Sequence, residues 1–293
     1  MPPGHGRYSM NIIVGVLLVL GCVFGGFVLS GGQLLALWHP PELLIIGGGA
    51  FGGFVIANSP TVIKATFKSL PAILKGSPYK KALYLELLAL LYELLMKARK
   101  EGLMSLEAHV EEPDKSPIFS QYPKILANHH AMDFLTDYLR LMVTGTANAL
   151  EMENLMDLEM ETHHQEAHAP SHAVQGMADG LPGFGIVAAV MGVVITMASI
   201  SAGPEVIGAK VAAALVGTFV GILLSYGFAG PIANSMGTLA ADEGKFIEVI
   251  KVTLLASLNG YSPQVAIEFG RKVIYHAERP GFTELEEYVK QKK

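Results

Sequence analysis

The sequence is short of charge. Only 16% of its 293 residues are Asp, Glu, Lys or Arg, whereas soluble domains contain about 25%. Because 51% of the residues are hydrophobic, the composition indicates a membrane protein and excludes a disordered or collagen-like chain. The net charge of −5 carries no basic excess, so we expect no nucleic acid partner.

Cysteine and catalytic motifs are also scarce. The single cysteine, Cys22, excludes a disulfide framework and a metal site built from several cysteines. The sequence has no nucleophile constellation, no P-loop and no H-E-x-x-H pattern. We therefore expect neither an enzyme nor a bound cofactor.

The missing charges define four long apolar stretches. Asp, Glu, Lys and Arg are absent from residues 8–41, 43–63, 180–204 and 211–241. A helix needs about 20 apolar residues to cross the hydrocarbon core of a bilayer, so each stretch predicts one membrane span. The predicted spans are about 11–30, 42–59, 181–202 and 208–232.

The positive charges predict the orientation of these spans. The linker 31–41 has no Lys or Arg, and the linker 201–210 has only Lys210. Residues 60–180 contain 11 Lys and Arg, and residues 233–293 contain 8. Because Lys and Arg concentrate in cytoplasmic loops, both large segments and both termini are predicted to be cytoplasmic.

The predicted fold class is all-α, with four transmembrane helices and a large cytoplasmic helical domain between the second and the third. Helix-forming residues fill 61–104, where Gly102 is expected to end the helix, and 122–168. Residues 240–290 also favour helices, with breaks at Asn259-Gly260 and Pro280-Gly281. The predicted domains are a first span pair in 1–59, the cytoplasmic domain in 60–180, a second span pair in 181–232 and a helical tail in 233–293.

Glycines in the spans have two interpretations. GGGAFGG at 47–53 contains the G-x-G-x-x-G pattern of dinucleotide-binding sites, but no acid follows before Glu86 to hold a ribose. A packing role is favoured, because G-x-x-x-G spacing lets two helix backbones approach closely. The residues with this spacing include Gly48 with Gly52 and Gly217 with Gly221.

Histidines gather in residues 163–172. Those spaced by four, which share one face of a helix, are His164, His168 and His172, and such a face is compatible with a metal site. Pro170 is expected to break the helix before His172, however, so an exposed polar linker is favoured and no metal site is predicted. His129 and His130 are interpreted in the same way.

The spans lack a central ionisable residue, which a proton path across a bilayer usually needs. The third and fourth spans offer only small polar side chains, namely Thr196, Ser199, Ser201, Thr218 and Ser225. If the protein moves ions, a partner must therefore supply the carboxylate.

Several segments carry a family resemblance. They are VFGGFVLSGG at 23–32, LLALLYELLMKARKEGLMSLEAHVE at 87–111, LPGFGIVAAVMGVV at 181–194, VGTFVGILLSYGFAGPIA at 216–233 and KVTLLASLNGYSPQVAIEFGRKVIYHAERPGF at 251–282. In this order they resemble the MotA family of flagellar motor stator proteins, within the MotA/ExbB/TolQ proton channel superfamily, over about residues 10–293. Residues 1–9 have no counterpart, so the resemblance implies that Met10 is the native start.

The resemblance implies a motor subunit in the bacterial inner membrane. Members of the family form a ring, expected to be a pentamer, around a dimer of MotB. MotB is a single-span, peptidoglycan-binding protein whose span carries the ion-binding aspartate. Ion passage is thought to turn the ring and drive the rotor protein FliG.

The resemblance also assigns roles to single residues. Arg99 and Glu107 match a charged pair that acts on oppositely charged rotor residues. Pro182 and Pro231 match two prolines that couple ion binding to movement, and Thr218 matches a threonine that faces the ion path. Asp133 aligns with an acid of the cytoplasmic domain, whose role is less defined.

The coupling ion is predicted to be the proton. Sodium needs several oxygen ligands, and sodium-type relatives have a threonine in the third span where this chain has Ala188 and Ala189. Thr196 and Ser199, which lie one or two turns further along the third span, carry hydroxyl groups, so sodium remains an alternative coupling ion. The alternative function is that of an ExbB/TolQ-like energiser of outer-membrane processes, although those proteins usually have three spans.

Overall fold

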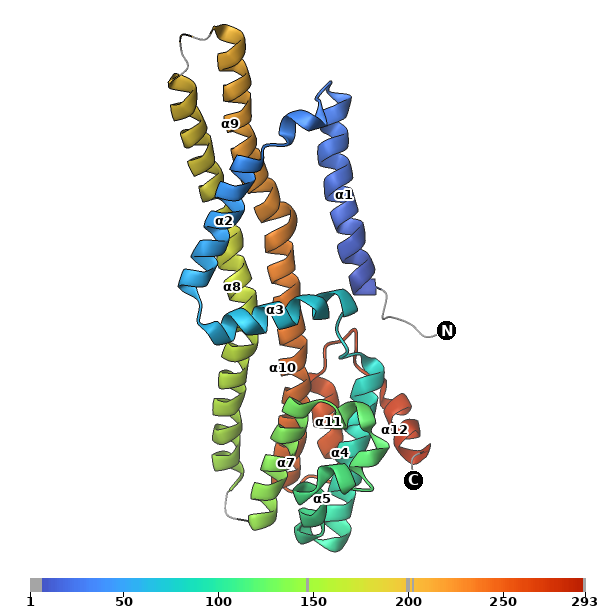
Figure 1. The fold of residues 1–293 in the computed structure, drawn as a ribbon. Coiled ribbons are helices and arrows are strands. Elements are labelled where there is room, and N and C mark those ends of the chain that lie inside the picture. Colours follow the sequence, from blue (N-terminus) through green and yellow to red (C-terminus); the bar gives the residue numbers. More distant parts are fainter. Residues whose placement is uncertain (1–6, 146–147, 199–200, 202, 292–293) are drawn as a thin grey trace. The chain divides into compact units, whose positions relative to one another are not determined.

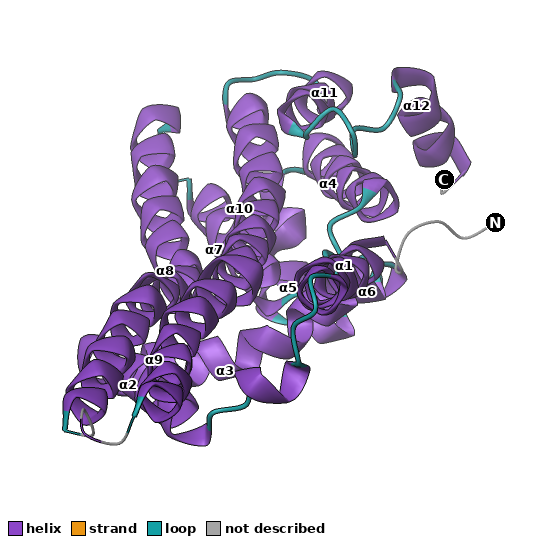
Figure 2. Ribbon diagram, turned by 90° about the horizontal axis from the view of Figure 1, so that it is seen from above, coloured by secondary structure: helices purple, strands orange, loops and turns teal. Residues whose placement is uncertain are grey.

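The computed structural model describes residues 7–145, 148–198, 201 and 203–291. The regular structure of these residues is helical throughout (Figure 2), which confirms the predicted all-α class. The chain divides into two compact units, and Figure 1 labels their helices. The membrane unit comprises the described residues up to Ser77 together with 166–239, and the α4 unit comprises 78–165 and the described residues from Ala240 onward.

Four helices among the described residues are long and apolar enough to cross a membrane, which confirms the four predicted spans. The first two lie in α1 (Arg7–Leu29) and α2 (Pro40–Ala57), with a short 3₁₀ turn between them at Leu34–Leu37. The third is α8 (Ala149–Met197), and the fourth runs through α9 (Pro204–Leu224), a π-helical turn at Ser225–Ala229 and α10 (Gly230–Leu258). At 49 and 55 residues, the last two far exceed the length that a bilayer requires.

The prediction of one continuous helix over 61–104 is wrong, because the chain leaves the helical conformation between residues 76 and 80. The structure has two helices, α3 (Pro60–Lys75) and α4 (Lys81–Glu101), separated by residues 76–80. Gly76 adopts φ +73° there, a conformation that only glycine takes readily, and Pro78 follows two residues later. The other end is as predicted, because α4 ends at Glu101 and Gly102 has φ +85°.

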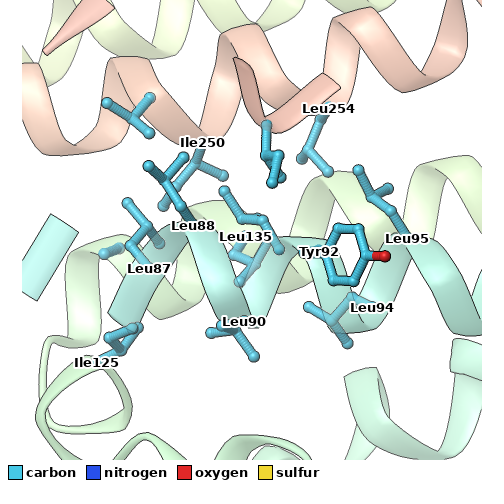
Figure 3. Packing of buried hydrophobic residues seen from close by; sticks show 14 of the residues in the cluster. Leu87, Leu88, Leu90, Tyr92, Leu94, Leu95, Ile125, Leu135, Ile250 and Leu254 are labelled. Atoms are coloured by element: carbon cyan, nitrogen blue, oxygen red, sulfur yellow. The ribbon is translucent and has the colours of Figure 1, made fainter. Parts of the chain in front are cut away.

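The α4 unit is built around α4, which is buried on nearly every face. Its core includes Leu87, Leu88 and Leu90, each fully shielded from solvent, and Figure 3 shows them in one cluster with Ile250 and Leu254 of α10. A helix that is apolar all round is expected in the centre of a domain. The surrounding helices are α5 (Glu107–Glu111), α6 (Pro123–Leu126), α7 (His129–Thr144), α11 (Pro263–Val273) and α12 (Phe282–Gln291), with 3₁₀ turns at Leu103–Leu106, Pro113–Lys115 and Phe119–Gln121.

Helix α8 does not break at Pro170, contrary to the prediction from sequence. It continues through Pro170 and Pro182 to Met197. A proline removes one backbone hydrogen bond and disfavours the helix interior, but packing routinely overrides such propensities. Pro170 is buried in the membrane unit, so its ring gains contacts that offset the lost bond.

The C-terminal segment breaks where the sequence predicts. Helix α10 ends at Leu258, α11 begins at Pro263, and α12 begins at Phe282 after Pro280-Gly281. The buried Arg271 fixes this last turn: its Nε donates to Glu268 at 2.6 Å, and its Nη1 donates to the carbonyl oxygen of Pro280 at 2.9 Å. The charged side chain is therefore paired, as a buried charge must be.

Candidate functional site

Arg99 and Glu107 lie on an exposed surface of the α4 unit. Arg99 is in the last turn of α4, Glu107 begins α5, and both are exposed. Among the residues that the structure describes, neither takes part in an ion pair. Met104, on the 3₁₀ turn between them, is 64% exposed. This surface, which we call the α4–α5 corner, therefore offers charges of both signs beside an apolar side chain, and such a mixture suits a transient interface.

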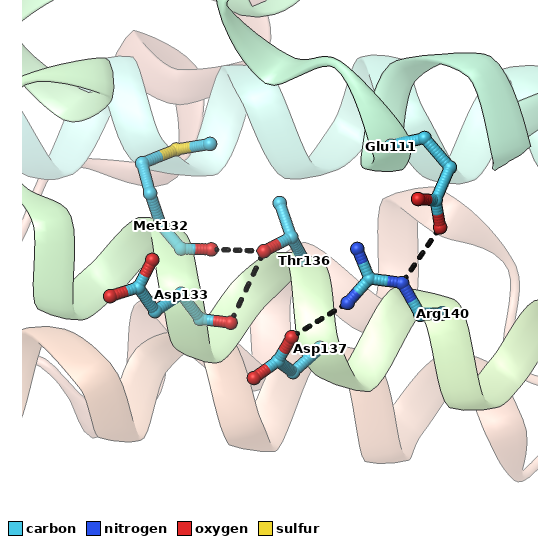
Figure 4. Close-up of polar contacts among 6 residues, drawn as sticks. All are labelled: Glu111, Met132, Asp133, Thr136, Asp137 and Arg140. Carbon is cyan, nitrogen blue, oxygen red and sulfur yellow. Dashed lines mark hydrogen bonds and ion pairs between the residues drawn. The ribbon is translucent and has the colours of Figure 1, made fainter.

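An ion pair holds the short helix α5 against α7. Arg140 of α7 donates from Nε to Glu111 of α5 at 2.8 Å and from Nη1 to Asp137 at 2.8 Å (Figure 4). Glu111 lies one helical turn after Glu107, so this contact helps to fix the direction of Glu107. Asp133, which the resemblance singles out, is exposed one turn before Asp137.

The neighbours of Arg99 keep defined charges near neutral pH. The hydrogen bond from Lys97 to Glu101, 2.8 Å long, lowers the pKa of Glu101, so this carboxylate stays ionised. His109 is buried on α5 with its Nδ1 2.8 Å from the hydroxyl of Ser116, and burial lowers the pKa of His109. The imidazole therefore adds no positive charge to the α4–α5 corner.

Small residues bring α8 and α9 into close contact. A Cβ atom at Gly221 would lie 2.7 Å from the carbonyl oxygen of Leu181, and one at Gly217 would lie 3.0 Å from Cβ of Ala188. On the opposite helix, a Cβ at Gly185 would lie 2.9 Å from the carbonyl oxygen of Gly217. The glycines thus allow backbone contact between the third and fourth spans. Gly185 was not singled out from the sequence, although its i+4 spacing to Leu181 and Ala189 places it on the same face.

We expect Gly221→Ala to destabilise this helix pair by about 1–3 kcal/mol, the usual cost of overpacking. The added methyl would meet backbone, which cannot rotate away as a side chain can. The measurement is the midpoint of thermal unfolding of the purified protein in detergent. Gly208→Ala on the same helix is the control, because its Cβ would meet nothing within 4 Å. Equal midpoints for the two variants would contradict a packing role for Gly221.

Within the part of the chain that the structure describes, no other helix lies close to the other predicted packing glycines. A Cβ at Gly52 would meet nothing within 4 Å, and one at Gly48 would meet only Leu44 of its own helix at 3.9 Å. Their packing role stays a prediction. The neighbouring Gly49, which has the same spacing to Gly53, does have a close contact, because its Cβ would lie 2.4 Å from the ring of Phe184 on α8.

The residues predicted to line the ion path lie on this same helix pair. Ala188 is 2% exposed against Gly217, whereas Ala189 and Thr218 are half-buried. The hydroxyl of Thr196 donates to the carbonyl oxygen of Gly192 at 2.7 Å, so its hydrogen bond is made within its own helix. Ser199 lies outside the described residues. No Asp, Glu, His, Lys or Arg occurs in residues 181–202 or 211–232, and a proton path along these helices still needs a carboxylate from elsewhere.

The two predicted coupling prolines interrupt these helices differently. Pro182 lies inside α8 and is half-buried, whereas Pro231 is exposed at the start of α10. The π-helical turn Ser225–Ala229 ends two residues before Pro231, and Gly230 N–H donates to the carbonyl oxygen of Ser225. π-helical turns and prolines are both sites where helices bend, so the fourth span has a local weak point at Pro231.

The chain matches two family profiles. Residues 13–102 match the one described as "Motility protein A N-terminal", and residues 127–248 match the "MotA/TolQ/ExbB proton channel family". The sequence is 50% identical to Motility protein A of Salmonella typhimurium over 281 residues, which are 96% of this chain and 95% of that one.

Two solved structures are similar in fold. The C. jejuni MotAB structure matches with a TM-score of 0.75 at 21% identity, over 93% of this chain and 98% of that chain. The flagellar MotAB stator complex from Bacillus subtilis matches with a TM-score of 0.67 at 26% identity, over 87% and 92% of the two chains.

Proposed function

The chain belongs to the MotA/TolQ/ExbB proton channel family and is a relative of motility protein A. We propose that it is an ion-conducting stator subunit of the bacterial flagellar motor. It couples proton flow through the membrane unit to torque at the α4–α5 corner. The observation that carries the proposal is the close α8–α9 contact, which packs through glycines and has no Asp, Glu, His, Lys or Arg in residues 181–202 and 211–232.

This pair needs a partner that carries a carboxylate. We infer a MotB-type protein whose single span supplies the ion-binding aspartate beside Thr218 and Ala189. The exposed apolar side chains of α8 support this, because Val190 and Val194 are 57% and 64% exposed in the single chain. Together with exposed residues on α1, they also offer surface for lipid and for other copies of this chain in a ring, a pentamer by family resemblance.

The α4–α5 corner would contact the rotor protein FliG. In this arrangement both large segments and both termini lie in the cytoplasm of a multi-pass inner-membrane protein, in accord with the positive-inside rule. Mixed exposed charges at Arg99 and Glu107 would set the register of the transient contact and speed its formation.

The coupling ion is tested by collapsing gradients. Cells that lack their own stator would express this chain with its candidate MotB partner, and swimming speed would be recorded while the proton and sodium gradients are removed separately. We expect swimming to stop only when the proton gradient is lost, because Ala188 and Ala189 supply no side-chain oxygen for sodium. The control is the same strain without this chain.

Two other outcomes would change the proposal. Loss of swimming with the sodium gradient alone would keep the motor function and contradict the proton assignment. Cells that never swim, although both proteins are in the membrane, would contradict the stator function and favour the ExbB/TolQ-like alternative.

A further inference from the structure

Three polar side chains from three different helices meet in the α4 unit. His130 lies in the first turn of α7, Glu243 lies on α10, and His163 lies on α8. Nδ1 of His130 is 2.8 Å from Oε1 of Glu243, and Nε2 of His163 is 3.8 Å from the same oxygen. One atom from each residue lies within 4.8 Å of the other two, so all three point toward a common centre.

Hydrogen bonding does not explain the position of His163. Its Nε2 atom is buried and, among the residues that the structure describes, has no hydrogen-bond partner. A separation of 3.8 Å from Glu243 is too long for a hydrogen bond. Two ligands of one tetrahedral zinc ion, each bound at 2.0–2.2 Å, lie about 3.3 Å apart. The buried nitrogen therefore faces the carboxylate at close to the spacing of two metal ligands.

The donor set favours a transition metal. Imidazole nitrogen suits zinc, copper, nickel and iron, whereas magnesium and calcium prefer oxygen ligands. Two histidines and one glutamate with a position left open for water form a known zinc-binding set. The side chain of His130 is 64% exposed, which leaves an entry path and room for that water.

We propose that His130, His163 and Glu243 form a binding site for a divalent transition-metal ion, with Zn²⁺ as the expected occupant. The rings of the two histidines lie edge to face, with centroids 5.4 Å apart. The side chain of His130 is 64% exposed, so it has room to rotate toward the spacing that zinc requires. The proposal is independent of the stator function, because its three ligands lie in the α4 unit, away from the glycine contacts between α8 and α9 and outside the α4–α5 corner.

A bound ion would join α7 to α8 and α10. These last two helices are the ones that continue into the third and fourth spans. Binding to the folded state alone stabilises that state, so Zn²⁺ is expected to raise the thermal midpoint of the protein. The bound ion would link three helices through residues that lie far apart in the sequence, because His163 follows His130 by 33 positions and Glu243 follows His163 by 80.

The test is direct zinc binding to the full-length chain. The protein would be purified in detergent with an affinity tag that contains no histidine, dialysed against micromolar Zn²⁺, and its metal content measured by mass spectrometry. We expect one Zn²⁺ per chain, no displacement by Mg²⁺, and a rise in the thermal midpoint. Replacing Zn²⁺ with Co²⁺ should give the visible absorption of a tetrahedral site.

Variants decide whether these residues are the ligands. His163→Gln and His130→Gln should each weaken Zn²⁺ binding by at least about tenfold and abolish the rise in thermal midpoint. His130 is mostly exposed, so its variant is expected to fold even if a change at Glu243 does not. The matched control is His276→Gln, which removes an exposed histidine from the same unit. Absence of binding at micromolar Zn²⁺, or equal affinity in wild type and His163→Gln, would overturn the proposal.

Discussion

Replacing Pro231 with alanine is expected to stop rotation while the protein still assembles in the membrane. Pro231 has no N–H group, so the carbonyl of Gly227 receives no regular helical hydrogen bond from it. The π-helical turn Ser225–Ala229 ends two residues before it. Alanine restores the donor, favours a regular α-helix and removes the weak point at which the fourth span can bend. The measurement is swimming speed, with membrane content of the protein followed by immunoblot.

The control for Pro231→Ala is Pro204→Ala in the same long helical run. Pro204 lies in the first turn of α9, where a missing N–H group costs nothing, so this variant should swim normally. Normal swimming by Pro231→Ala would contradict a coupling role for the proline. Loss of the protein from the membrane would instead assign it a structural role.

Pro182→Ala is expected to have the same effect on the third span. It also lies inside a helix, but no π-helical turn accompanies it among the described residues of α8. Its control is Pro170→Ala, a proline in the same helix that no motor role involves. If both variants stopped swimming, a general effect on α8 would account for the loss and a specific role for Pro182 would not be needed.

The spans could be predicted because they depend on a local property. A stretch without charge of about 20 residues has few alternatives to a membrane helix, so four stretches gave four helices. Local turn chemistry was equally informative at Gly102 and at Asn259-Gly260. The same rules also indicate a break at Gly76-Ser77-Pro78, between α3 and α4, although the strong helix formers on either side favour one continuous helix.

The errors arise where packing outweighs local preference. Pro170 was expected to end a helix, but its ring is buried and α8 continues. The grouping of histidines by helical spacing was also uninformative, because the residue that faces Glu243 is His163 and its neighbour His130 comes from another helix. A site assembled from three helices depends on tertiary structure, which spacing along one helix does not report.

The contacts of the glycines were only partly predictable for a related reason. G-x-x-x-G spacing draws attention to Gly217 and Gly221, which lie against α8. It does not identify their counterpart Gly185, because this residue has no glycine four positions away. Nor does it separate Gly49, which lies against Phe184, from Gly48 and Gly52, which have no such contact among the described residues.

Reversing the charge of Arg99 is also expected to cause a large loss of swimming speed. Arg99 is exposed and forms no ion pair among the described residues, so Arg99→Glu leaves the fold of the α4 unit intact. Like charges placed opposite each other at an interface cost several kcal/mol, so contact with an acidic rotor residue should become repulsive. Swimming speed would fall severely, and a charge reversal on that rotor residue should restore part of it.

The matched control for Arg99→Glu is Lys100→Glu, the adjacent exposed residue of the same helix turn. Both variants change the net charge equally, so a general electrostatic effect would slow both to the same degree. A contact specific to Arg99 should leave Lys100→Glu near wild-type speed. Glu107→Lys, which reverses the partner charge on α5, should slow swimming as Arg99→Glu does. Wild-type speed in the combined variant Arg99→Glu with Glu107→Lys, on an unaltered rotor, would show that the α4–α5 corner transmits torque without these charges.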